Sequence, residues 1–426
     1  MPQLPAALSR SVAVSALRRS PVAIIFVGIL ILLALAGAAA YVVWLGQQTA
    51  ATARVFGLAL LASLLLALAA LGVIGWLDRR ERESPWVFFG IFLFGLVISS
   101  GLGLLISGGA GVALFDGIGL SATDARAFDP LVQAALPLER MGRDEAIRLG
   151  LDAALVAPLI EELLKALAVA LAFLFLRGEF DNVRDGLVYG ALAGLGFAVG
   201  ETAYAVARSF AETGSAAFVQ QFVAHFALLG LGGHTLFAAL LGAGFGLARE
   251  ERRRAMQVIA PLAFFLLAFF AHLVYNTLTL SVAGTILAFL GLPDASLETA
   301  PPAALWLAIV AATALTLGLF YVALGHLLER SGRWEQAVIR TELAGEVGKV
   351  ITADEYRILL AEGLFSLRSA PNYPARISRA IVNAQNELAF RKWRVRFEGG
   401  DPEADAIVAG WREDIAAWRA AGRGAA

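Results

Sequence analysis

The chain has 426 residues, of which 59% are hydrophobic and only 16% are charged, and its mean hydropathy is +0.72. This composition excludes a soluble globular protein, because it arises from several apolar runs that are long enough to cross a bilayer. The net charge of −1 provides no basic field, so no nucleic-acid partner is expected. Cysteine is absent, which excludes disulfides, thiolate metal ligands and a cysteine nucleophile.

The first apolar run extends from Val22 to Leu45 and follows Arg10, Arg18 and Arg19. A signal peptide has the same order of features, but its apolar core is only about 7–15 residues long. We therefore expect residues 1–21 to be a cytoplasmic N-terminal segment and the run to be a retained first membrane span.

The spacing of the apolar runs predicts an all-α, polytopic membrane protein with about eight transmembrane helices in residues 22–328. The expected spans are Val22–Leu45, Val55–Leu77, Trp86–Ile106, Leu149–Leu176, Gly186–Ala207, Phe222–Ala248, Val258–Leu280 and Leu305–Leu324. The apolar stretch Ser281–Leu292 is either an extension of the seventh helix or an interfacial segment. The loop Gly108–Arg148 is expected to face outward and to cover the outer mouth of a site.

Arginines gather at alternate junctions, namely those after the second, fourth and sixth spans. These arginines are Arg79, Arg80, Arg82, Arg177, Arg184, Arg249, Arg252, Arg253 and Arg254. By the positive-inside rule, these junctions and both termini are cytoplasmic. The sequence thus predicts a multi-pass protein of the cell membrane with both ends inside.

From residue 329 to residue 426 the composition is that of a soluble domain. Thr352 and Glu355 have the spacing of a capping box, and Asp401-Pro402 is typical of a helix start. Together with several amphipathic segments, these features predict a small C-terminal cytoplasmic helical domain whose partner the sequence does not indicate. The basic run Arg391–Arg396 suits either a solvated helix face or contact with anionic lipid.

Two carboxylates and an ammonium lie in the middle of the fourth span: Glu161, Glu162 and Lys165. Each costs roughly 2.5–3.5 kcal/mol at the bilayer centre, so such groups persist where they pair, line a cavity or take part in chemistry. Their spacings of three and four residues place them on one helix face. Both a structural ion-pair cluster and a catalytic centre remain open on this motif alone.

Three further spans also carry polar residues, and these share one depth with the fourth. Glu162, Glu201, His234 and His272 are each 14 or 15 residues from the expected cytoplasmic end of their span. This is about 21–23 Å at 1.5 Å per residue. We therefore expect the four residues to form one cluster, with Asn276 on the face of His272.

The two other histidines, His225 and His326, fit this level less well and are expected to be interfacial. The fifth span carries Gly186, Gly190 and Gly194 on one face, which predicts close approach of another helix. We expect spans four to seven to form an inner bundle, with the first three spans outside it.

The ordered motifs resemble those of the PrsW family of intramembrane proteases, which is related to the CAAX prenyl endopeptidases and the bacterial CAAX-like proteases. These motifs are Glu161-Glu162-x-x-Lys165, Phe197-x-x-x-Glu201, His234 and His272-x-x-x-Asn276. The resemblance covers Leu149–Asn276, the core of a motif region at residues 149–280, and does not reach the tail. The second motif ends in glutamate, as in PrsW proteins, whereas CAAX endopeptidases have histidine there.

The resemblance implies an endopeptidase that hydrolyses peptide bonds at or within the bilayer. Glu161 or Glu162 would act as general base, and His272 and Asn276 would stabilise the oxyanion. Glu201 and His234 would orient water or bind metal, and His234, His272 and Glu201 would suit one Zn²⁺ or another divalent ion. A metal-free glutamate mechanism uses the same residues.

The expected substrate is a single-span or membrane-anchored protein, and anti-sigma-factor-type proteins are one candidate class. Two other classes of function remain open. An ion-coupled transporter also uses intramembrane acids and histidines, but it predicts repeated halves that this sequence lacks. A catalytically inactive membrane scaffold would tolerate loss of motif residues, whereas here every motif position is filled.

Overall fold

A computed structural model describes residues 21–80, 84–107, 152–176, 180–293, 299–363, 366 and 368–423. These residues form helices and their connections, with no β-strand among them. They divide into a membrane unit, within residues 16–76 and 85–324, and a tail unit, within residues 77–84 and 325–426. The expected outer loop Gly108–Arg148 and most of the N-terminal segment lie outside the described residues.

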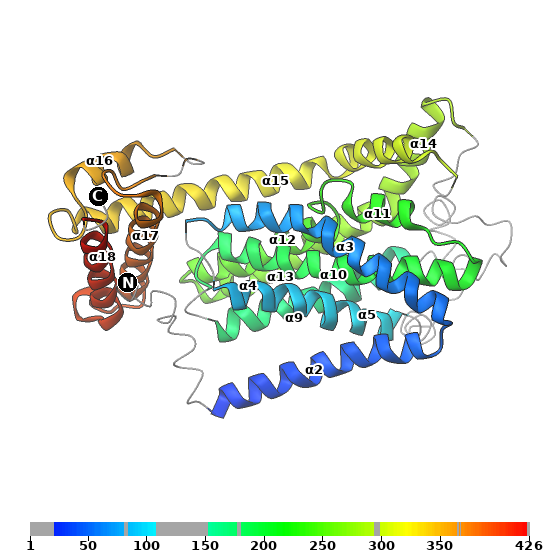
Figure 1. Cartoon of the computed structure of the whole chain (residues 1–426), viewed down its shortest axis with the longest axis horizontal. Coiled ribbons are helices and arrows are strands. Elements are labelled where there is room, and N and C mark those ends of the chain that lie inside the picture. Colours follow the sequence, from blue (N-terminus) through cyan, green and yellow to red (C-terminus); the bar gives the residue numbers. More distant parts are fainter. Residues whose placement is uncertain are drawn as a thin grey trace. The chain divides into compact units, whose positions relative to one another are not determined.

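The helices of the membrane unit are named here in chain order (Figure 1). They are α2 (Pro21–Gly46), α3 (Ala50–Leu77), α4 (Pro85–Leu93), η1 (Phe94–Ser99), α5 (Ser100–Ser107), η4 (Asp152–Val156), α9 (Ala157–Phe175), α10 (Val183–Thr213), α11 (Phe218–Phe226), α12 (His234–Glu250), α13 (Arg254–Val274), η5 (Tyr275–Thr279), α14 (Leu280–Phe289) and α15 (Pro302–Ala344). The segments η1, η4 and η5 are π-helical turns, which widen a helix locally. Residues of α15 from Gly325 onward belong to the tail unit.

Six helices in the described part of the chain are long and apolar enough to cross a membrane. They are Val27–Gly46, Ala50–Leu77, Pro85–Leu104, Val183–Thr213, Arg254–Phe289 and Pro302–Ala344. The expected spans Leu149–Leu176 and Phe222–Ala248 are not among them. The first of these contains α9, whose 19 residues include three ionisable side chains. The run from Arg254 to Phe289 shows that the seventh helix is extended rather than followed by a separate interfacial segment.

The expected helix Phe222–Ala248 is not continuous, so this prediction is wrong. Helix α11 ends at Phe226 and α12 begins at His234. In the connection, Leu229, Gly230 and Gly233 have φ of 56°, 76° and 52°. A right-handed helix cannot pass through such values, and the glycines adopt them without a Cβ clash. His234 is therefore the first residue of a helix rather than a residue in the middle of one.

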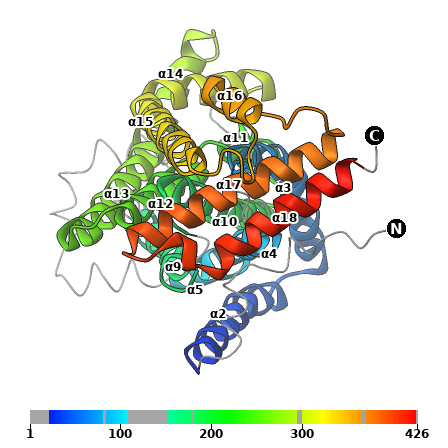
Figure 2. The same ribbon diagram turned by 90° about the vertical axis from the view of Figure 1, so that its left-hand side faces the viewer.

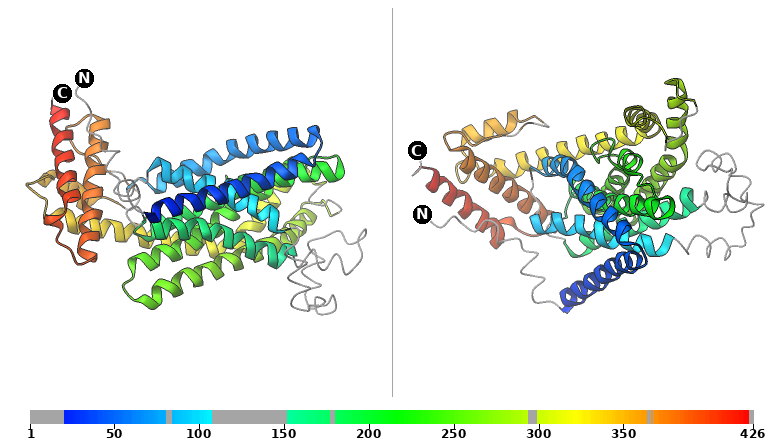
Figure 3. Two further views of the ribbon diagram at one scale, coloured as in Figure 1. Left: turned by 90° about the horizontal axis from the view of Figure 1, so that it is seen from below. Right: turned by 45° about the vertical axis from the view of Figure 1, so that its right-hand side comes forward.

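The glycine face of α10 packs against α12, as its spacing predicts. A Cβ atom at Gly186, Gly190 or Gly194 would collide with a backbone carbonyl of α12, that of Gly242, Ala238 or His234 respectively. The close approach of the two helices therefore needs these glycines. Contacts join α10 to α12 and α12 to α13, and Figure 3 shows the green helices of the membrane unit bundled together.

The opposite face of α10 packs against the third expected span. A Cβ atom at Gly196 would collide with the carbonyl oxygen of Phe92 in α4, and α10 also contacts η1. The expectation that all of the first three spans lie outside the inner bundle is therefore wrong for the third. The reason is that α10 carries two glycine faces, and only one of them meets α12.

The tail unit contains the last part of α15 with α16 (Ala353–Ala361), α17 (Ala375–Phe397), η6 (Pro402–Ala404) and α18 (Ala406–Arg423). Helices α17 and α18 lie side by side, as Figure 2 shows. The expected capping box is present, with Glu355 N donating to Thr352 Oγ1 at 3.1 Å and Thr352 N donating to Glu355 Oε2 at 2.8 Å. Asp401 caps only the 3₁₀ turn η6, and Asp405 caps α18.

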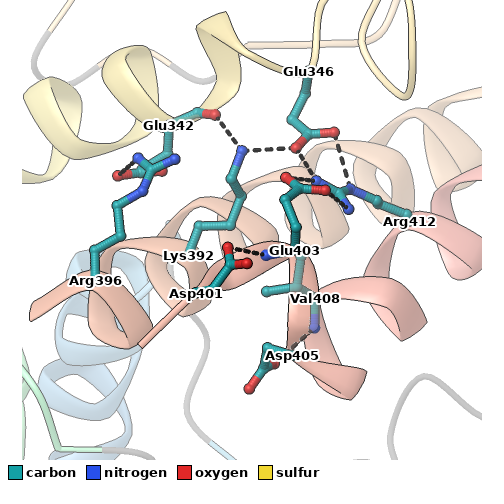
Figure 4. Close-up of polar contacts among 9 residues, drawn as sticks. All are labelled: Glu342, Glu346, Lys392, Arg396, Asp401, Glu403, Asp405, Val408 and Arg412. Carbon is teal, nitrogen blue, oxygen red and sulfur yellow. Dashed lines mark hydrogen bonds and ion pairs between the residues drawn. The ribbon is translucent and has the colours of Figure 1, made fainter. Parts of the chain in front are cut away.

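Basic residues of the run Arg391–Arg396 form ion pairs within the tail unit, and Figure 4 shows those of Lys392 and Arg396. Lys392 Nζ donates to Glu346 Oε1 at 2.7 Å and to the Glu342 carbonyl at 3.0 Å, and its side chain is 3% exposed. Arg396 and Arg391 pair with Glu342 and Asp405, each at 2.6 Å. The run is therefore not a uniformly solvated face: Lys392 is buried, whereas the side chain of Arg396 is 52% exposed.

The connector between α3 and α4, Leu77–Ser84, belongs to the tail unit. Arg80 is 3% exposed, donates to the carbonyls of Gly332 and Gly363 at 3.3 and 3.1 Å, and lies 3.4 Å from Glu362. Asn386 on α17 donates to the Arg80 carbonyl at 2.8 Å. The arginine-rich connector and the C-terminal helices therefore belong to one compact unit. A domain boundary at residue 329 alone leaves the connector out of that unit.

Candidate functional site

Helix α9 supplies the first three groups of a buried cluster. Pro158 lies in the first turn of α9, directly after the π-helical turn η4. The side chains of Glu162 and Lys165 are 0% exposed, and Lys165 Nζ donates to Glu162 Oε1 at 2.7 Å. Glu161 is more accessible, at 14%, with Oε2 lying 3.7 Å from the same ammonium. The expected shared face of these residues is therefore confirmed.

His272, in the last turn of α13, contacts the same glutamate as Lys165. Its Nδ1 lies 2.9 Å from Glu162 Oε1. A carboxylate paired with an ammonium only accepts hydrogen bonds, so Nδ1 carries the proton. The lone pair then belongs to Nε2, which lies 3.9 Å from Glu161 Oε2. Glu162 thus fixes which nitrogen of His272 is free for other ligands.

His234, at the start of α12, lies between Lys165 and Glu201. Its Nδ1 is 2.8 Å from Lys165 Nζ, and its Nε2 is 2.6 Å from Glu201 Oε2. An ammonium has donors only, so Nδ1 accepts from Lys165 and the proton is on Nε2, facing the carboxylate. Nδ1 is also 3.7 Å from Glu161 Oε2. Each histidine thus directs one nitrogen toward Glu161. The other nitrogen faces a second carboxylate, which is Glu201 for His234 and Glu162 for His272.

His225 also belongs to the cluster, and its expected interfacial position is wrong. Its Nε2 lies 3.3 Å from Glu201 Oε2, and its ring stacks on that of His234 with centroids 5.6 Å apart. A continuous helix would put the two histidines on nearly opposite faces. The break between α11 and α12 removes that constraint, and Gly230, Gly232 and Gly233 are the sequence signal that indicates the break.

The remaining motif residues have different surroundings. Lys165 Nζ lies over the ring of Phe197, 4.2 Å from its centroid. The centroids of the Phe197 and His234 rings are 4.9 Å apart. Asn276 is half-buried in η5, one turn beyond His272. Because η5 is π-helical, a spacing of four residues no longer puts it directly above His272. His326 belongs to the tail unit.

Among the described residues, two groups of side chains have the composition and proximity of a metal site, and both include His234. One contains Glu161 and His272, and the other contains Glu201 and His225, with the ligand atoms of each group within 4.8 Å of one another. The expected set of His234, His272 and Glu201 is divided between the two groups. Glu161 Oε2 is buried and accepts no hydrogen bond from any described residue.

The fold and the cluster define a class: a multi-pass helical membrane protein with a buried glutamate, histidine and lysine centre. A family model described as PrsW family intramembrane metalloprotease matches residues 83–315, more than half of the chain. The chain therefore belongs to the PrsW family. The resemblance that the motifs indicate is confirmed.

One curated relative is Protease PrsW of Geobacillus kaustophilus (strain HTA426), which is 35% identical over 130 residues. The match covers 30% of this chain and 52% of the relative, so the chain spans about half the length of the curated relative. No solved structure matches the chain.

Proposed function

We propose that the protein is an endopeptidase that hydrolyses peptide bonds of membrane proteins at or within the bilayer. The observation that carries this proposal is the position of Glu161 Oε2. This buried oxygen has no hydrogen bond from the described residues, yet it lies 3.7 Å from Lys165 Nζ, 3.7 Å from His234 Nδ1 and 3.9 Å from His272 Nε2. Membership of a metalloprotease family supports the same activity.

The donor set of Glu161, His234 and His272 fits one divalent ion, with zinc as the expected metal. Three protein ligands, with imidazole and carboxylate among them, are typical of catalytic zinc sites. Ligand atoms about 2.0–2.1 Å from zinc in a tetrahedron lie about 3.3 Å apart, which the distances of 3.7 and 3.9 Å approach. When bound, the ion would lower the pKa of a water molecule and polarise the scissile carbonyl.

The outer carboxylates support this assignment. A histidine that ligates a metal usually donates its other N–H to a carboxylate, which fixes its tautomer. Glu162 accepts from His272 Nδ1 at 2.9 Å, and Glu201 lies 2.6 Å from His234 Nε2. We therefore assign Glu201 to the orientation of His234 rather than to direct ligation through the nitrogen that faces Glu161.

Lys165 competes with the metal for one lone pair. Its Nζ lies 2.8 Å from His234 Nδ1, the nitrogen proposed as ligand. Both cannot use that lone pair at once, so metal binding requires the ammonium to turn away from His234. It would then keep Glu162, at 2.7 Å, as its partner. In this arrangement Lys165 compensates the charge of the carboxylates and does not touch the substrate.

The proton of the attacking water goes to Glu201 in the metal-dependent version, where Glu161 is a ligand, and to Glu161 in the metal-free version. Glu162 does not suit this role, because it is 0% exposed and its Oε1 contacts both Lys165 and His272. Glu161 and Glu201 are 14% and 28% exposed. Asn276 remains the proposed donor to the oxyanion, since the lone pair of His272 Nε2 is assigned to the metal.

The proposed substrates are single-span or membrane-anchored proteins, with anti-sigma-factor-type proteins as one candidate class. We place the protein in the cell membrane, with the connector and the C-terminal helices in the cytoplasm. The arginines of the connector support that side. The tail unit is then a cytoplasmic helical domain.

Metal analysis and a cleavage assay test the proposal together. Purified parent protein should contain about one zinc per chain and cleave a single-span reporter. His272→Ala should lose both properties. Glu161→Gln and Glu201→Gln should each abolish cleavage, and the variant that retains zinc identifies the proton acceptor. Full activity in a parent protein without stoichiometric metal would eliminate the metal-dependent version and leave the glutamate mechanism.

A further inference from the structure

His225 lies outside the motifs that define the family resemblance, yet it contacts the centre of the cluster. Its side chain is 12% exposed, and it is held at both ring nitrogens. Nδ1 lies 3.0 Å from the carbonyl oxygen of Gln221, one turn earlier in α11. Nε2 lies 3.3 Å from Glu201 Oε2. A carbonyl accepts hydrogen bonds and a carboxylate faces Nε2, so we assign a proton to both nitrogens, and His225 is an imidazolium whose charge attracts Glu201.

The contact with Glu201 connects His225 to His234. The same oxygen, Glu201 Oε2, lies 3.3 Å from His225 Nε2 and 2.6 Å from His234 Nε2. The two imidazoles stack with an angle of 19° between their planes. His225 therefore contacts the Glu201 carboxylate on one side and limits its movement, while His234 contacts the same oxygen on the other side.

We propose that His225 is a positioning residue, which holds Glu201 against Nε2 of His234 and so presents Nδ1 of His234 to Glu161. The proposal rests on the proposed function, in which that nitrogen is a metal ligand. His225 acts through Glu201 and does not touch the substrate or the metal.

A second metal ion among Glu201, His225 and His234 is the competing interpretation of the same residues. The distance of 2.6 Å between Glu201 Oε2 and His234 Nε2 is that of a direct contact between an imidazole nitrogen and a carboxylate. Two ligand atoms of one tetrahedral zinc would lie about 3.3 Å apart. The short distance therefore favours direct contact of these two atoms over a shared metal ion, and His225 is assigned to support that contact.

Two amide substitutions separate the hydrogen bond to Glu201 from the packing of the ring. The amide nitrogen of glutamine reaches about as far as Nε2 of histidine, whereas that of asparagine reaches only as far as Nδ1. His225→Gln thus keeps a donor for Glu201, and His225→Asn removes it. His326→Asn in the tail unit is the matched control for an amide in place of a histidine.

The measurements are zinc affinity, by competition with a chelator of known affinity, and kcat and KM on a single-span reporter, in purified full-length protein. Loss of a residue that orients a ligand costs about 10- to 100-fold in metal affinity or activity. We expect this loss for His225→Asn, in Kd and kcat, with KM and the melting temperature unchanged. His225→Gln and His326→Asn should stay within about threefold of the parent.

A double variant checks that His225 acts through Glu201. If it does, Glu201→Gln with His225→Asn binds zinc no more weakly than Glu201→Gln alone, because effects in one hydrogen-bond chain are not additive. The inference is overturned if His225→Asn and His225→Gln lose zinc affinity equally, or if both keep the parental affinity. It is also overturned if the losses of zinc affinity add up in the double variant. A second zinc per parent chain that His225→Asn removes favours the competing interpretation. A parent that neither binds zinc nor cleaves overturns the proposed function itself, whatever the variants do.

Discussion

Nδ1 of His272 lies 2.9 Å from Oε1 of Glu162, although the two residues are 110 positions apart in the chain. This contact joins α13 to α9 and decides which nitrogen of the histidine faces Glu161. The same oxygen accepts from Lys165 at 2.7 Å. One carboxylate oxygen thus orients a proposed metal ligand and balances a buried ammonium.

Glu162 should therefore be a stability determinant, unlike Glu161. Glu162→Gln leaves Lys165 buried without its closest counter-charge, and breaking a buried pair costs about 3–5 kcal/mol. We expect a clearly lower melting temperature in detergent. Glu161→Gln is the matched control, with both variants measured in zinc-free protein: it removes a carboxylate that accepts no hydrogen bond at Oε2 from the described residues, so the melting temperature should change little. Equal melting temperatures for the two variants would contradict the assignment.

Gly190 should not tolerate a side chain. A Cβ there would collide with the carbonyl oxygen of Ala238, so α10 and α12 would have to separate. Overpacking of this kind costs about 1–3 kcal/mol. Gly190→Ala should lower the melting temperature and weaken the cluster, since His234 begins α12. Gly57→Ala is the control, because no atom lies within 4 Å of a Cβ at Gly57.

The tail unit should lose stability in acid. Burial alone would raise the pKa of Glu346, but hydrogen bonds from Arg412 and Lys392 outweigh it and hold the pKa below the ordinary value of 4.5. The hydrogen bond from Arg391 holds the pKa of Asp405 below 3.8.

A carboxyl group whose pKa is lower in the folded than in the unfolded protein stabilises the fold at pH values above its unfolded-state pKa. This contribution is lost as the pH falls through the folded-state pKa. Hydrogen-exchange protection of α17 amides, measured relative to the intrinsic exchange rate at each pH, should therefore fall below about pH 4.5. Glu346→Gln should reduce this acid dependence, and an unchanged dependence would contradict the role of the ion pairs.

Arg80 should be needed for the tail unit although it lies far from it in sequence. Arg80→Ala leaves Glu335 and Glu362 buried without this counter-charge, with side chains 2% and 7% exposed. We expect faster proteolysis between α16 and α17. Arg333→Ala is the control, since Arg333 is 72% exposed and its pair with Glu329 is worth at most about 1 kcal/mol. Equal proteolysis in both variants would argue against a specific role of Arg80.

The sequence was sufficient to predict that the side chains of the cluster meet, because helices of regular rise place residues at equal distances from an arginine-rich end at one level. Glu162, His234 and His272 meet for this reason. The position of His225 could not be predicted in the same way, since it depends on a helix break and on backbone values of φ near Gly230. Helical counting fails wherever the helix does not continue.

The tail unit shows a second limit of the sequence. Capping of α16 depends on Thr352 and Glu355, three residues apart, and local spacing was enough to predict it. The partners of Lys392 and Arg80 lie on other elements, and no local pattern indicates them. A basic run is predicted to be solvent-exposed as long as its counter-charges on other elements are unknown.

The connector also sets an order of events during synthesis. Arg80 is translated long before Asn386, which lies 306 residues later and closes over its carbonyl. The ribosome must therefore complete every helix of the membrane unit before this contact forms. Until then the guanidinium of Arg80 lacks Glu335 and Glu362, and its carbonyl lacks Asn386. Closure of the tail unit around Arg80 thus marks the point at which the membrane helices have all been made.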